Sequence, residues 1–340
     1  MRAAVIPGVN EKWEVRDVPT PAPGPGEVLV EVRACGICYN DILATSGAIP
    51  FPATDPAIPG HEVAGVVVEV GAGVTSRRTG DRVGVTWVQA TCGRCAHCRS
   101  HRPVGGQAAL NCAAPSMTGF TVPGGQAQYL VAAAEATVLI PDGLPDELAA
   151  PILCAGYTAW SAFRAAEPRP HDRVAVLGIG GVGHLALQFA KASGAETIAV
   201  TRSPDKHDLA RALGADIVVA DGQELRDVGG ADIVLVTGTS YAAATDCLHG
   251  LRADGRMVLA GIDPAGGLTI PPNLWPPFFA QRHKLIGATH NGLHLLSEAL
   301  DLAASRAVVP QVETFQLNEI SHAVDRVASS TVRFRAVITP

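Results

Sequence analysis

The sequence has few aromatic residues and no surplus of positive charge. Of its 340 residues, 5% are aromatic and 17% are charged, and the acidic residues outnumber the basic ones to give a formal net charge of −6. A chain without a basic patch is poorly suited to bind nucleic acid or an anionic membrane surface. We therefore expect a small-molecule partner and no nucleic acid.

The sequence also lacks long apolar runs and a recognisable targeting segment. No stretch approaches the roughly 18 apolar residues of a membrane span, and the N-terminal MRAAVIPGVNEKWEV has no apolar secretory core. We expect no membrane association and a cytoplasmic location. Because that compartment keeps thiols reduced, the eight cysteines are expected to be metal ligands or catalytic groups rather than disulfides.

Two domains of different structure are predicted. Between residues 172 and about 287, apolar strand-like segments alternate with helical patterns, which is typical of a parallel sheet covered by helices. Residues 1–150 contain short alternating segments separated by Pro- and Gly-rich turns, which indicates an antiparallel β region. We expect an α/β chain with a doubly wound parallel sheet at 151–290 and a mainly antiparallel domain at 1–150 and 291–340.

A glycine pattern follows the first strand of the predicted parallel sheet. Gly178, Gly180 and Gly183 form G-x-G-x-x-G, with Gly181 and Val182 inside it, directly after VAVL and before a helical pattern. The first glycine permits a tight turn, the second lets the backbone approach a pyrophosphate, and the third lets helix and strand pack closely. The context predicts a dinucleotide-binding loop, and a plain Gly-rich turn is the alternative.

The residues after the second predicted strand bear on which dinucleotide binds. An NAD site has an Asp or Glu about 20 residues after the loop, where it accepts hydrogen bonds from the ribose 2′-hydroxyl. Here that place holds Thr201, followed by Arg202 and Ser203, with Lys206 one helical turn later. Two cations and a hydroxyl match a 2′-phosphate, so we predict NADP(H). The alternative is that Arg202 and Lys206 are solvated surface charges.

Four cysteines have the spacing of a metal site. Cys92, Cys95 and Cys98 form C-x2-C-x2-C, and Cys112 follows after thirteen residues. Thiolates at this spacing can converge tetrahedrally on zinc, and four protein ligands close the site to water, so the zinc would be structural. A set of free thiols is the alternative. A zinc-ribbon nucleic-acid binder would fit the cluster by itself but not the negative net charge.

Further candidate ligands are dispersed along the chain. Cys38, the pair His61–Glu62 and Cys154 are separated by many residues, and spacing alone does not join them. Each also has an ordinary interpretation, with Cys154 as a small core residue, His61 as a turn histidine and Cys38 as an inert thiol.

Several segments occur in a familiar order. They are ACGICYND, PGHEVAGVVVEVGAGV, CGRCAHC, APILCAG, GIGGVGH and the closing VRFRAVITP. Over essentially its whole length the chain resembles the medium-chain zinc-dependent alcohol dehydrogenases, most of all the bacterial NADP-preferring and cinnamyl-alcohol-dehydrogenase-like branch. The resemblance implies a GroES-like catalytic domain, a Rossmann coenzyme domain, and a homodimer or homotetramer.

The resemblance assigns the metal ligands. It implies that Cys38, His61 and Cys154 bind a catalytic zinc with a water or the substrate oxygen as fourth ligand, and that Glu62 is a neighbouring or exchangeable ligand. Asp41 resembles the carboxylate that orients the histidine ligand. The four clustered cysteines correspond to a structural zinc, although the family has a shorter segment before the last one.

The resemblance also implies contacts with the cofactor and the substrate. Thr158 resembles the threonine beside the nicotinamide, and Arg335 the arginine on the pyrophosphate. Trp87 resembles an aromatic wall of the substrate pocket. Further cofactor contacts are expected at the ends of later strands, namely Thr237, Gly261 and Ile262.

One position departs from the family pattern. Asn40 stands where many relatives have Ser or Thr, and Leu43 where some have a proton-relay histidine. A carboxamide forms hydrogen bonds but does not titrate usefully. Our hypothesis is that Asn40 orients the substrate oxygen while water or the phenol of Tyr39 exchanges the proton. The alternative is that Asn40 faces away from the pocket.

These expectations define a function. The chain is predicted to be a zinc-dependent oxidoreductase that interconverts alcohols and aldehydes or ketones by hydride transfer with NADP(H), with aldehyde reduction as the expected direction and zinc as the Lewis acid. The alternatives are an NAD-dependent polyol or secondary-alcohol dehydrogenase and a redox-inactive relative that only binds the nucleotide.

Overall fold

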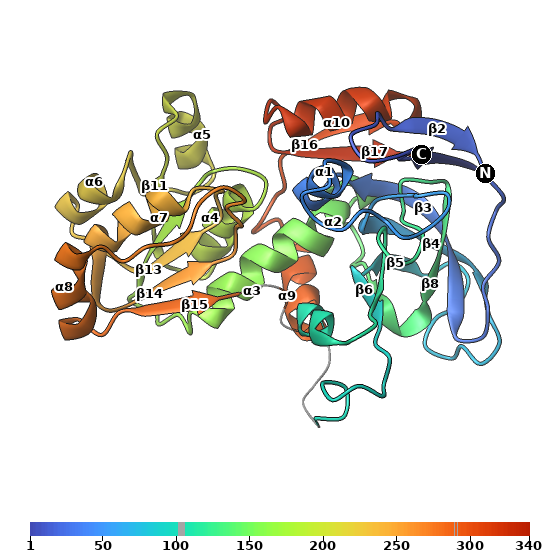
Figure 1. Ribbon diagram of the computed structural model, residues 1–340, viewed down its shortest axis with the longest axis horizontal. Coiled ribbons are helices and arrows are strands. Elements are labelled where there is room, and N and C mark those ends of the chain that lie inside the picture. The colour runs from blue at the N-terminus through green and yellow to red at the C-terminus, as the bar shows by residue number, and fades with distance from the viewer. Residues whose placement is uncertain (101–105, 289, 291) are drawn as a thin grey trace. The chain divides into compact units, whose positions relative to one another are not determined.

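The chain divides into two compact units in a computed structural model that describes residues 1–100, 106–288, 290 and 292–340. The first unit comprises Met1–Ala155, Asn291–Ala304 and Pro310–Pro340, and the second comprises Gly156–His290 and Ser305–Val309 (Figure 1). Part of the long segment between Cys98 and Cys112, residues 101–105, lies outside the described residues. Each unit has its own sheet.

The second unit contains a parallel sheet of six strands within the described residues. Their order across the sheet is β12-β11-β10-β13-β14-β15, so the chain runs outward from β10 and then returns to its other side. The predicted doubly wound parallel sheet is therefore confirmed, with its switch point between β10 and β13. The strands are β10 (Arg173–Leu177), β11 (Glu196–Val200), β12 (Ile217–Val219), β13 (Ala231–Val236), β14 (Leu251–Leu259) and β15 (Lys284–Gly287).

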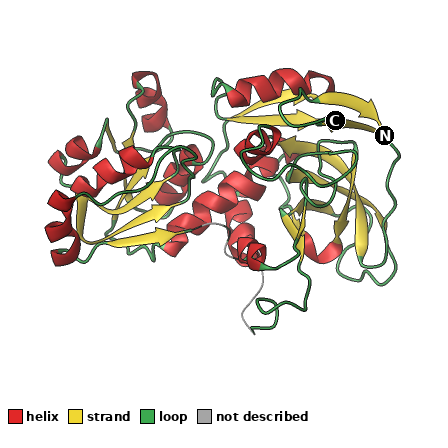
Figure 2. Ribbon diagram, viewed as in Figure 1, coloured by secondary structure: helices red, strands yellow, loops and turns green. Residues whose placement is uncertain are grey.

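Helices pack around the strands of this sheet (Figure 2). Two of them begin at side-chain caps, since Asp221 accepts a hydrogen bond from the backbone N–H of Glu224 and Ser240 accepts one from Ala243. The helices are α3 (Tyr157–Ala165), α4 (Gly183–Ala192), α5 (His207–Ala212), α6 (Gly222–Asp227), α7 (Tyr241–Cys247) and α8 (Trp275–Ala280), with short 3-10 turns η4 (Pro204–Lys206), η5 (Leu248–Gly250) and η6 (Pro272–Leu274).

The first unit is built on a mainly antiparallel sheet, as predicted. The order is β16-β17-β3-β4-β5-β9, with β8 also paired to β3, and β16–β17 is a parallel pair. The strands are β3 (Glu27–Gly36), β4 (Glu62–Val70), β5 (Arg82–Val85), β8 (Tyr129–Ala133), β9 (Thr137–Leu139), β16 (Val312–Gln316) and β17 (Arg335–Thr339). Two small antiparallel pairs are β1 (Arg2–Val5) with β2 (Glu14–Asp17) and β6 (Val88–Ala90) with β7 (Ser116–Met117).

Short helical segments connect the strands of the first unit. The helices are α1 (Tyr39–Thr45), α2 (Asp146–Pro151), α9 (Leu293–Ala304) and α10 (Ile320–Ala328), and the 3-10 turns are η1 (Gly106–Asn111), η2 (Ala134–Ala136) and η7 (Leu317–Glu319). After α2 the chain forms a π-helical turn, η3 (Ile152–Gly156), which contains Cys154. Within the described residues, none of the helices combines the length and the apolar character that crossing a membrane requires.

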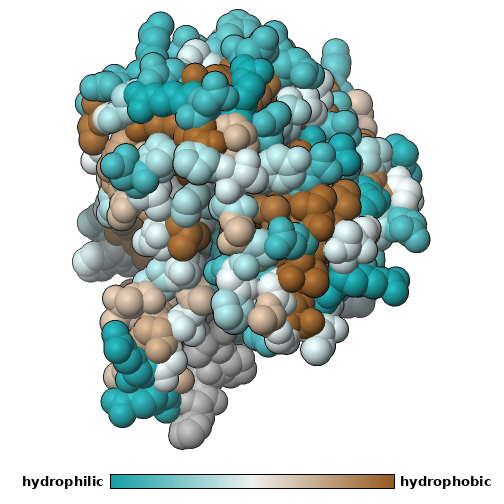
Figure 3. Space-filling view, turned by 90° about the vertical axis from the view of Figure 1, so that its right-hand side faces the viewer, coloured by the Kyte–Doolittle hydropathy of each residue, from teal (hydrophilic) through white to brown (hydrophobic). Residues whose placement is uncertain are grey.

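The surface of the first unit is a mixture of polar and apolar side chains. On the side shown in Figure 3, apolar groups occur at several places among polar ones. The large apolar residues that are exposed in this unit include Val9, Tyr39, Val70 and Leu139. Exposed apolar side chains in such numbers are ordinary on a globular protein and call for no partner.

Candidate active site

Four dispersed side chains of the first unit converge on one point. Cys38, His61, Glu62 and Cys154 each offer a ligand atom, and these atoms lie within 4.8 Å of one another. The sulfurs of Cys38 and Cys154 are 3.8 Å apart. That distance excludes a disulfide, which requires about 2.05 Å, and it matches the roughly 3.8 Å between two sulfurs at about 2.3 Å from a tetrahedral zinc. The fold thus brings together residues that their spacing in the sequence did not link.

The sheet register brings these residues together. Strand β3 ends at Gly36, which pairs with Glu62 at the start of β4. Cys38, two residues after β3, and His61, directly before β4, therefore lie at adjacent strand ends. Gly36 also pairs with Val337 of β17. A Cβ atom at Gly36 would lie 2.0 Å from the Oε2 atom of Glu62, so this position requires the close approach that glycine allows.

Asp41 holds the buried imidazole of His61. The Oδ1 atom of Asp41 is 3.3 Å from Nδ1 of His61, and its Oδ2 atom accepts a hydrogen bond of 2.9 Å from the backbone N–H of Cys38. Burial disfavours the charged imidazole, but the charges of Asp41 and Cys38 outweigh it and hold the pKa of His61 well above its ordinary value.

Several buried side-chain atoms in and around the converging group have no hydrogen-bond partner among the described residues. Among the described residues, neither Nε2 of His61 nor Oε2 of Glu62 has a hydrogen-bond partner. Hydrogen bonding to Cys154 lowers the pKa of Cys38 well below its ordinary value, against the opposing effect of burial, so the thiolate is favoured. A thiolate and an unpartnered imidazole nitrogen are the donors that Zn²⁺ prefers, so the residues present fit a zinc ion.

Arg335 belongs to this buried group. Its Nη2 atom donates to the backbone oxygen of Ile37 at 3.0 Å and forms an ion pair with Oε1 of Glu62. Burial raises the pKa of Glu62 to about 7, even though the charge of Arg335 acts in the opposite direction. The structure thus places Arg335 against a candidate ligand, and its expected contact with a pyrophosphate stays a prediction.

Aromatic rings line the imidazole ligand. Trp87 stacks on His61 with ring centroids 5.1 Å apart, and Phe120 lies 5.9 Å from His61 and 5.5 Å from Trp87. Phe120 belongs to no motif and was not predicted from the sequence. Asn40 is half-buried in the first turn of α1, whereas Tyr39 beside it is 42% exposed.

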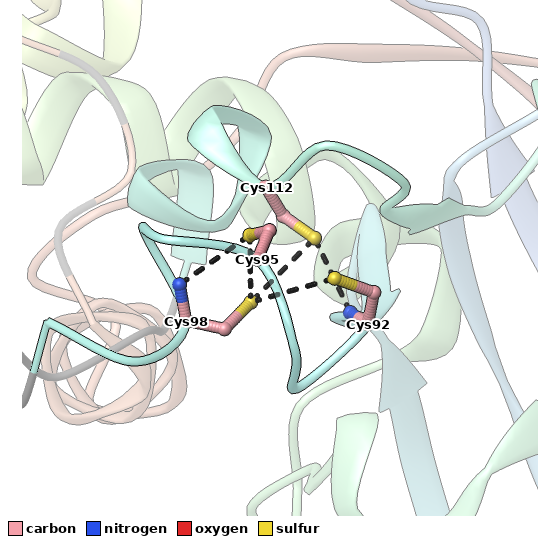
Figure 4. A group of neighbouring side chains, drawn as sticks. All are labelled: Cys92, Cys95, Cys98 and Cys112. Atoms are coloured by element: carbon pink, nitrogen blue, oxygen red, sulfur yellow. Dashed lines mark hydrogen bonds between the residues drawn. The ribbon is translucent and has the colours of Figure 1, made fainter.

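The four clustered cysteines form a second converging group (Figure 4). The sulfur of Cys98 lies 3.4 Å from that of Cys95, 3.6 Å from that of Cys112 and 3.9 Å from that of Cys92. These distances again exclude disulfides and fit four thiolates around one zinc. Cys112 follows η1 and joins the group, so the long preceding segment does not keep it away.

Backbone N–H groups point at these sulfurs. Cys92 donates to the sulfur of Cys112 at 3.2 Å, and Cys98 donates to that of Cys95 at 3.4 Å. Backbone hydrogen bonds, with that of Ala113 first among them, lower the pKa of Cys95 to about 6, whereas desolvation and the neighbouring thiols raise that of Cys98 to about 11. A divalent cation would remove the repulsion that prevents all four thiols from ionising together.

The glycine loop of the second unit has the geometry of a dinucleotide site. Gly178 has φ of +91°, and a Cβ at Gly183 would lie 1.9 Å from the carbonyl oxygen of Gly178. A Cβ at Gly180 would meet nothing within 4 Å, which leaves open space next to the backbone. Helix α4 starts at Gly183, directly after the loop, so the positive end of the helix dipole lies beside the loop and the loop fits a pyrophosphate.

The end of β11 lies against this loop. Thr201 is buried, and its hydroxyl accepts a hydrogen bond from the N–H of Ser203 at 3.3 Å. The Nζ atom of Lys206 donates to the carbonyl oxygen of Ile179, inside the glycine loop, at 3.0 Å. Lys206 is therefore not a purely solvated charge, whereas Arg202 is exposed.

The other predicted cofactor residues of the second unit follow β13 and β14 or begin α3. Thr237 donates to the carbonyl oxygen of Gly178 at 2.8 Å. Gly261 accepts a hydrogen bond of 3.2 Å from the hydroxyl of Tyr241, and Ile262 is 63% exposed. Thr158 is half-buried at the start of α3, with its hydroxyl 3.0 Å from Nε2 of His290, a residue that sequence analysis missed.

Comparison with known proteins agrees with this geometry. The family described as "Alcohol dehydrogenase GroES-like domain" matches residues 24–142, and "Zinc-binding dehydrogenase" matches residues 181–305. An alcohol dehydrogenase from Geobacillus stearothermophilus is 39% identical over 344 residues, covering 99% of each chain.

Two solved structures share the fold over the whole chain. Acetophenone reductase from Geotrichum candidum, in complex with NAD, is 28% identical with a TM-score of 0.84, covering 100% of this chain and 97% of the other. CAD from Helicobacter pylori, complexed with NADP(H), is 26% identical with a TM-score of 0.86, covering 100% and 99%. The resemblance found in the sequence is thereby confirmed. The chain belongs to the medium-chain zinc-dependent alcohol dehydrogenase family and is an oxidoreductase that acts on alcohols and aldehydes.

Proposed function

We propose that this enzyme uses NADP(H) in preference to NAD(H) and acts mainly as an aldehyde reductase. The observation that carries the cofactor preference is the end of β11, where Thr201, Arg202 and Ser203 occupy the place of the acidic residue that an NAD site requires. Lys206 supports it, because its contact with Ile179 holds an ammonium group at the glycine loop. Aldehyde reduction is the direction that a supply of NADPH drives.

We assign the catalytic zinc to Cys38, His61 and Cys154, with Glu62 as a neighbouring or exchangeable ligand. When bound there, zinc supplies a Lewis acid for the substrate oxygen. Asp41 orients His61 through the 3.3 Å contact between its Oδ1 atom and Nδ1 of the imidazole, which leaves Nε2 as the ligand atom. The rings of Trp87 and Phe120 keep water from the imidazole on one side and offer an apolar wall to a substrate.

Two further roles concern the proton and the carboxylate of Glu62. We assign to Asn40 the orientation of the substrate oxygen through its carboxamide, and to water or the phenol of Tyr39 the exchange of the proton, because Tyr39 reaches solvent. Arg335 balances the buried charge of Glu62 and thereby keeps that carboxylate beside the metal ligands. The four clustered cysteines hold a structural zinc.

The cofactor preference is tested by steady-state kinetics with NADPH and NADH on a panel of aliphatic and aromatic aldehydes. We expect kcat/KM to be at least about tenfold higher with NADPH, since a charge-assisted contact to a phosphate contributes about 1.5–3 kcal/mol. Reduction at pH 7 should be faster than oxidation of the corresponding alcohol. A preference for NADH would refute the assignment of Arg202 and Lys206.

A matched pair of variants localises the effect. Lys206→Met should lower kcat/KM with NADPH by about 10- to 100-fold and leave the value with NADH within about twofold. Lys191→Met is the control, because it removes an exposed cation of the same unit that pairs with Asp216 instead. If the enzyme binds NADPH but reduces no aldehyde, the redox-inactive alternative holds.

A further inference from the structure

A buried histidine of the second unit is fixed against the start of α3. The ring of His290 stacks on that of Tyr157, with centroids 4.1 Å apart and an angle of 14° between the planes. Its Nε2 atom lies 3.0 Å from the hydroxyl oxygen of Thr158, and the histidine is 4% exposed. The stack fixes the plane of the imidazole and the hydrogen bond fixes its rotation.

The position of His290 in the sheet is that of a ligand-binding segment. Strand β15 ends at Gly287, three residues before His290, so the histidine lies just beyond the carboxyl end of a parallel strand. In doubly wound sheets, ligands bind outside the carboxyl ends of the strands. The glycine loop follows the carboxyl end of β10 in the same sheet.

The contact determines how the Thr158 hydroxyl can be used. A threonine hydroxyl has one proton to donate and two lone pairs that accept. If Nε2 of His290 accepts the hydroxyl proton, the lone pairs of Thr158 are directed to a ligand. If Nε2 carries a proton and donates it, the hydroxyl proton is available instead. In both cases the orientation of the hydroxyl is set by a buried, stacked ring rather than by solvent.

We propose that His290 is a positioning residue that orients the Thr158 hydroxyl toward the nicotinamide end of the bound dinucleotide. This inference rests on the proposed function in one respect, the place of Thr158 beside the nicotinamide. It is independent of whether the cofactor is NADP(H) or NAD(H), because the two share that end. The contact strengthens binding of the nicotinamide half and leaves the adenosine half unaffected.

Equilibrium binding to the full-length, zinc-loaded protein tests this proposal with two probes. NADPH contains the nicotinamide, whereas 2′-phospho-ADP-ribose has the same adenosine half without it. His290→Phe keeps an aromatic ring for the stack on Tyr157 and removes the nitrogen. We expect this variant to raise the Kd of NADPH about five- to tenfold and to leave the Kd of 2′-phospho-ADP-ribose within twofold.

Two further variants separate positioning from packing. His290→Gln retains a hydrogen-bonding group and should recover part of the lost NADPH affinity. Thr158→Val removes the hydroxyl at nearly constant volume and should weaken NADPH binding as His290→Phe does. Because both act through one hydrogen bond, the double variant should bind NADPH no more weakly than the poorer single variant.

Specific outcomes overturn the proposal. Unchanged NADPH binding in His290→Phe, an equal loss of affinity for both probes, or additive losses in the double variant would each contradict it. If NADH and ADP-ribose bind better than their phosphorylated forms, the NADP(H) preference fails, and the same comparison with those two probes still tests His290. If the probe with nicotinamide binds the unaltered enzyme no better than the probe without it, the inference fails while the phosphate assignment stands.

Discussion

The two groups of candidate metal ligands in the first unit are constructed in opposite ways. Three ligands of the clustered cysteines lie within residues 92–98, the set is all sulfur, and most of it is partly exposed. The other group joins cysteines 116 positions apart to a histidine and a carboxylate, all of which except Cys38 are buried. The clustered cysteines are held by local backbone N–H groups, whereas the dispersed group depends on Asp41 and Arg335.

This difference is the one expected between a structural metal site and a catalytic one. Four thiolates from a single loop would fill the coordination sphere of a zinc ion. Such a site stabilises the loop and leaves no coordination position for a substrate. The dispersed group has three protein donors in addition to a carboxylate that is paired with arginine, and it lies beside two aromatic rings. Such a group can accept a substrate oxygen.

The largest effect is expected from removing a ligand of the dispersed group. Cys154→Ser should lower kcat/KM by about a thousandfold or more, because the Lewis acid contributes several kcal/mol to the transition state. Metal analysis should show one zinc fewer per chain, with the clustered cysteines still loaded. Cys247→Ala, which removes a buried thiol that belongs to neither group, is the control and should keep both zinc ions. Full activity in Cys154→Ser would disprove the ligand assignment.

A smaller loss is expected when the support of a ligand is changed. Asp41→Asn keeps the shape of the side chain but weakens the contact with Nδ1 of His61. We expect zinc affinity or kcat/KM to fall about 10- to 100-fold, the usual effect of removing the partner of a histidine ligand. Competition with a chromophoric chelator measures the affinity. The contrast with the clustered cysteines would vanish if the substitution altered neither quantity.

The clustered cysteines should affect stability more than catalysis. Cys98→Ala removes a sulfur that lies 3.4 to 3.9 Å from each of the other three. We expect the Tm to fall by on the order of 10 °C through loss of the structural zinc, while kcat at 25 °C changes by less than about threefold. Calorimetry and initial rates measure the two. A loss of activity as large as that of Cys154→Ser would mean that both groups take part in the reaction.

The smallest effect concerns thiol reactivity after zinc is removed with a chelator. Backbone hydrogen bonds lower the pKa of Cys95 to about 6, so it is a thiolate at pH 7. Burial raises the pKa of Cys247 to about 12, so that thiol keeps its proton and ionises only far above neutrality. Because the thiolate is the nucleophile, iodoacetamide should label Cys95 faster than Cys247 and at a rate that changes little between pH 7 and 8. Peptide mass spectrometry identifies the labelled site. Faster labelling of Cys247 than of Cys95 would contradict the predicted order of their pKa values.

Local patterns predicted much of the molecule. The alternation of strand and helix signals from 172 to 287 predicted the doubly wound sheet, and the glycine spacing predicted a loop whose first glycine has positive φ. Two residues, Phe120 and His290, and one pairing, that of Arg335 with Glu62, were not predicted at that level. Phe120 beside His61 and His290 beside Thr158 belong to no motif, and the pairing of Arg335 with Glu62 joins opposite ends of the chain.

From the sequence by itself come the features that neighbouring residues specify, namely the glycine loop after β10, the missing acid after β11 and the thiol spacing of residues 92–98. Only the tertiary structure decided that Cys38, His61 and Cys154 meet, and that Lys206 returns to Ile179. The physical reason is that chain spacing constrains distances over a few residues, whereas the distance between remote segments is set by strand register and packing. Here the pairing of Gly36 with Glu62 brings together the segments that carry Cys38 and His61.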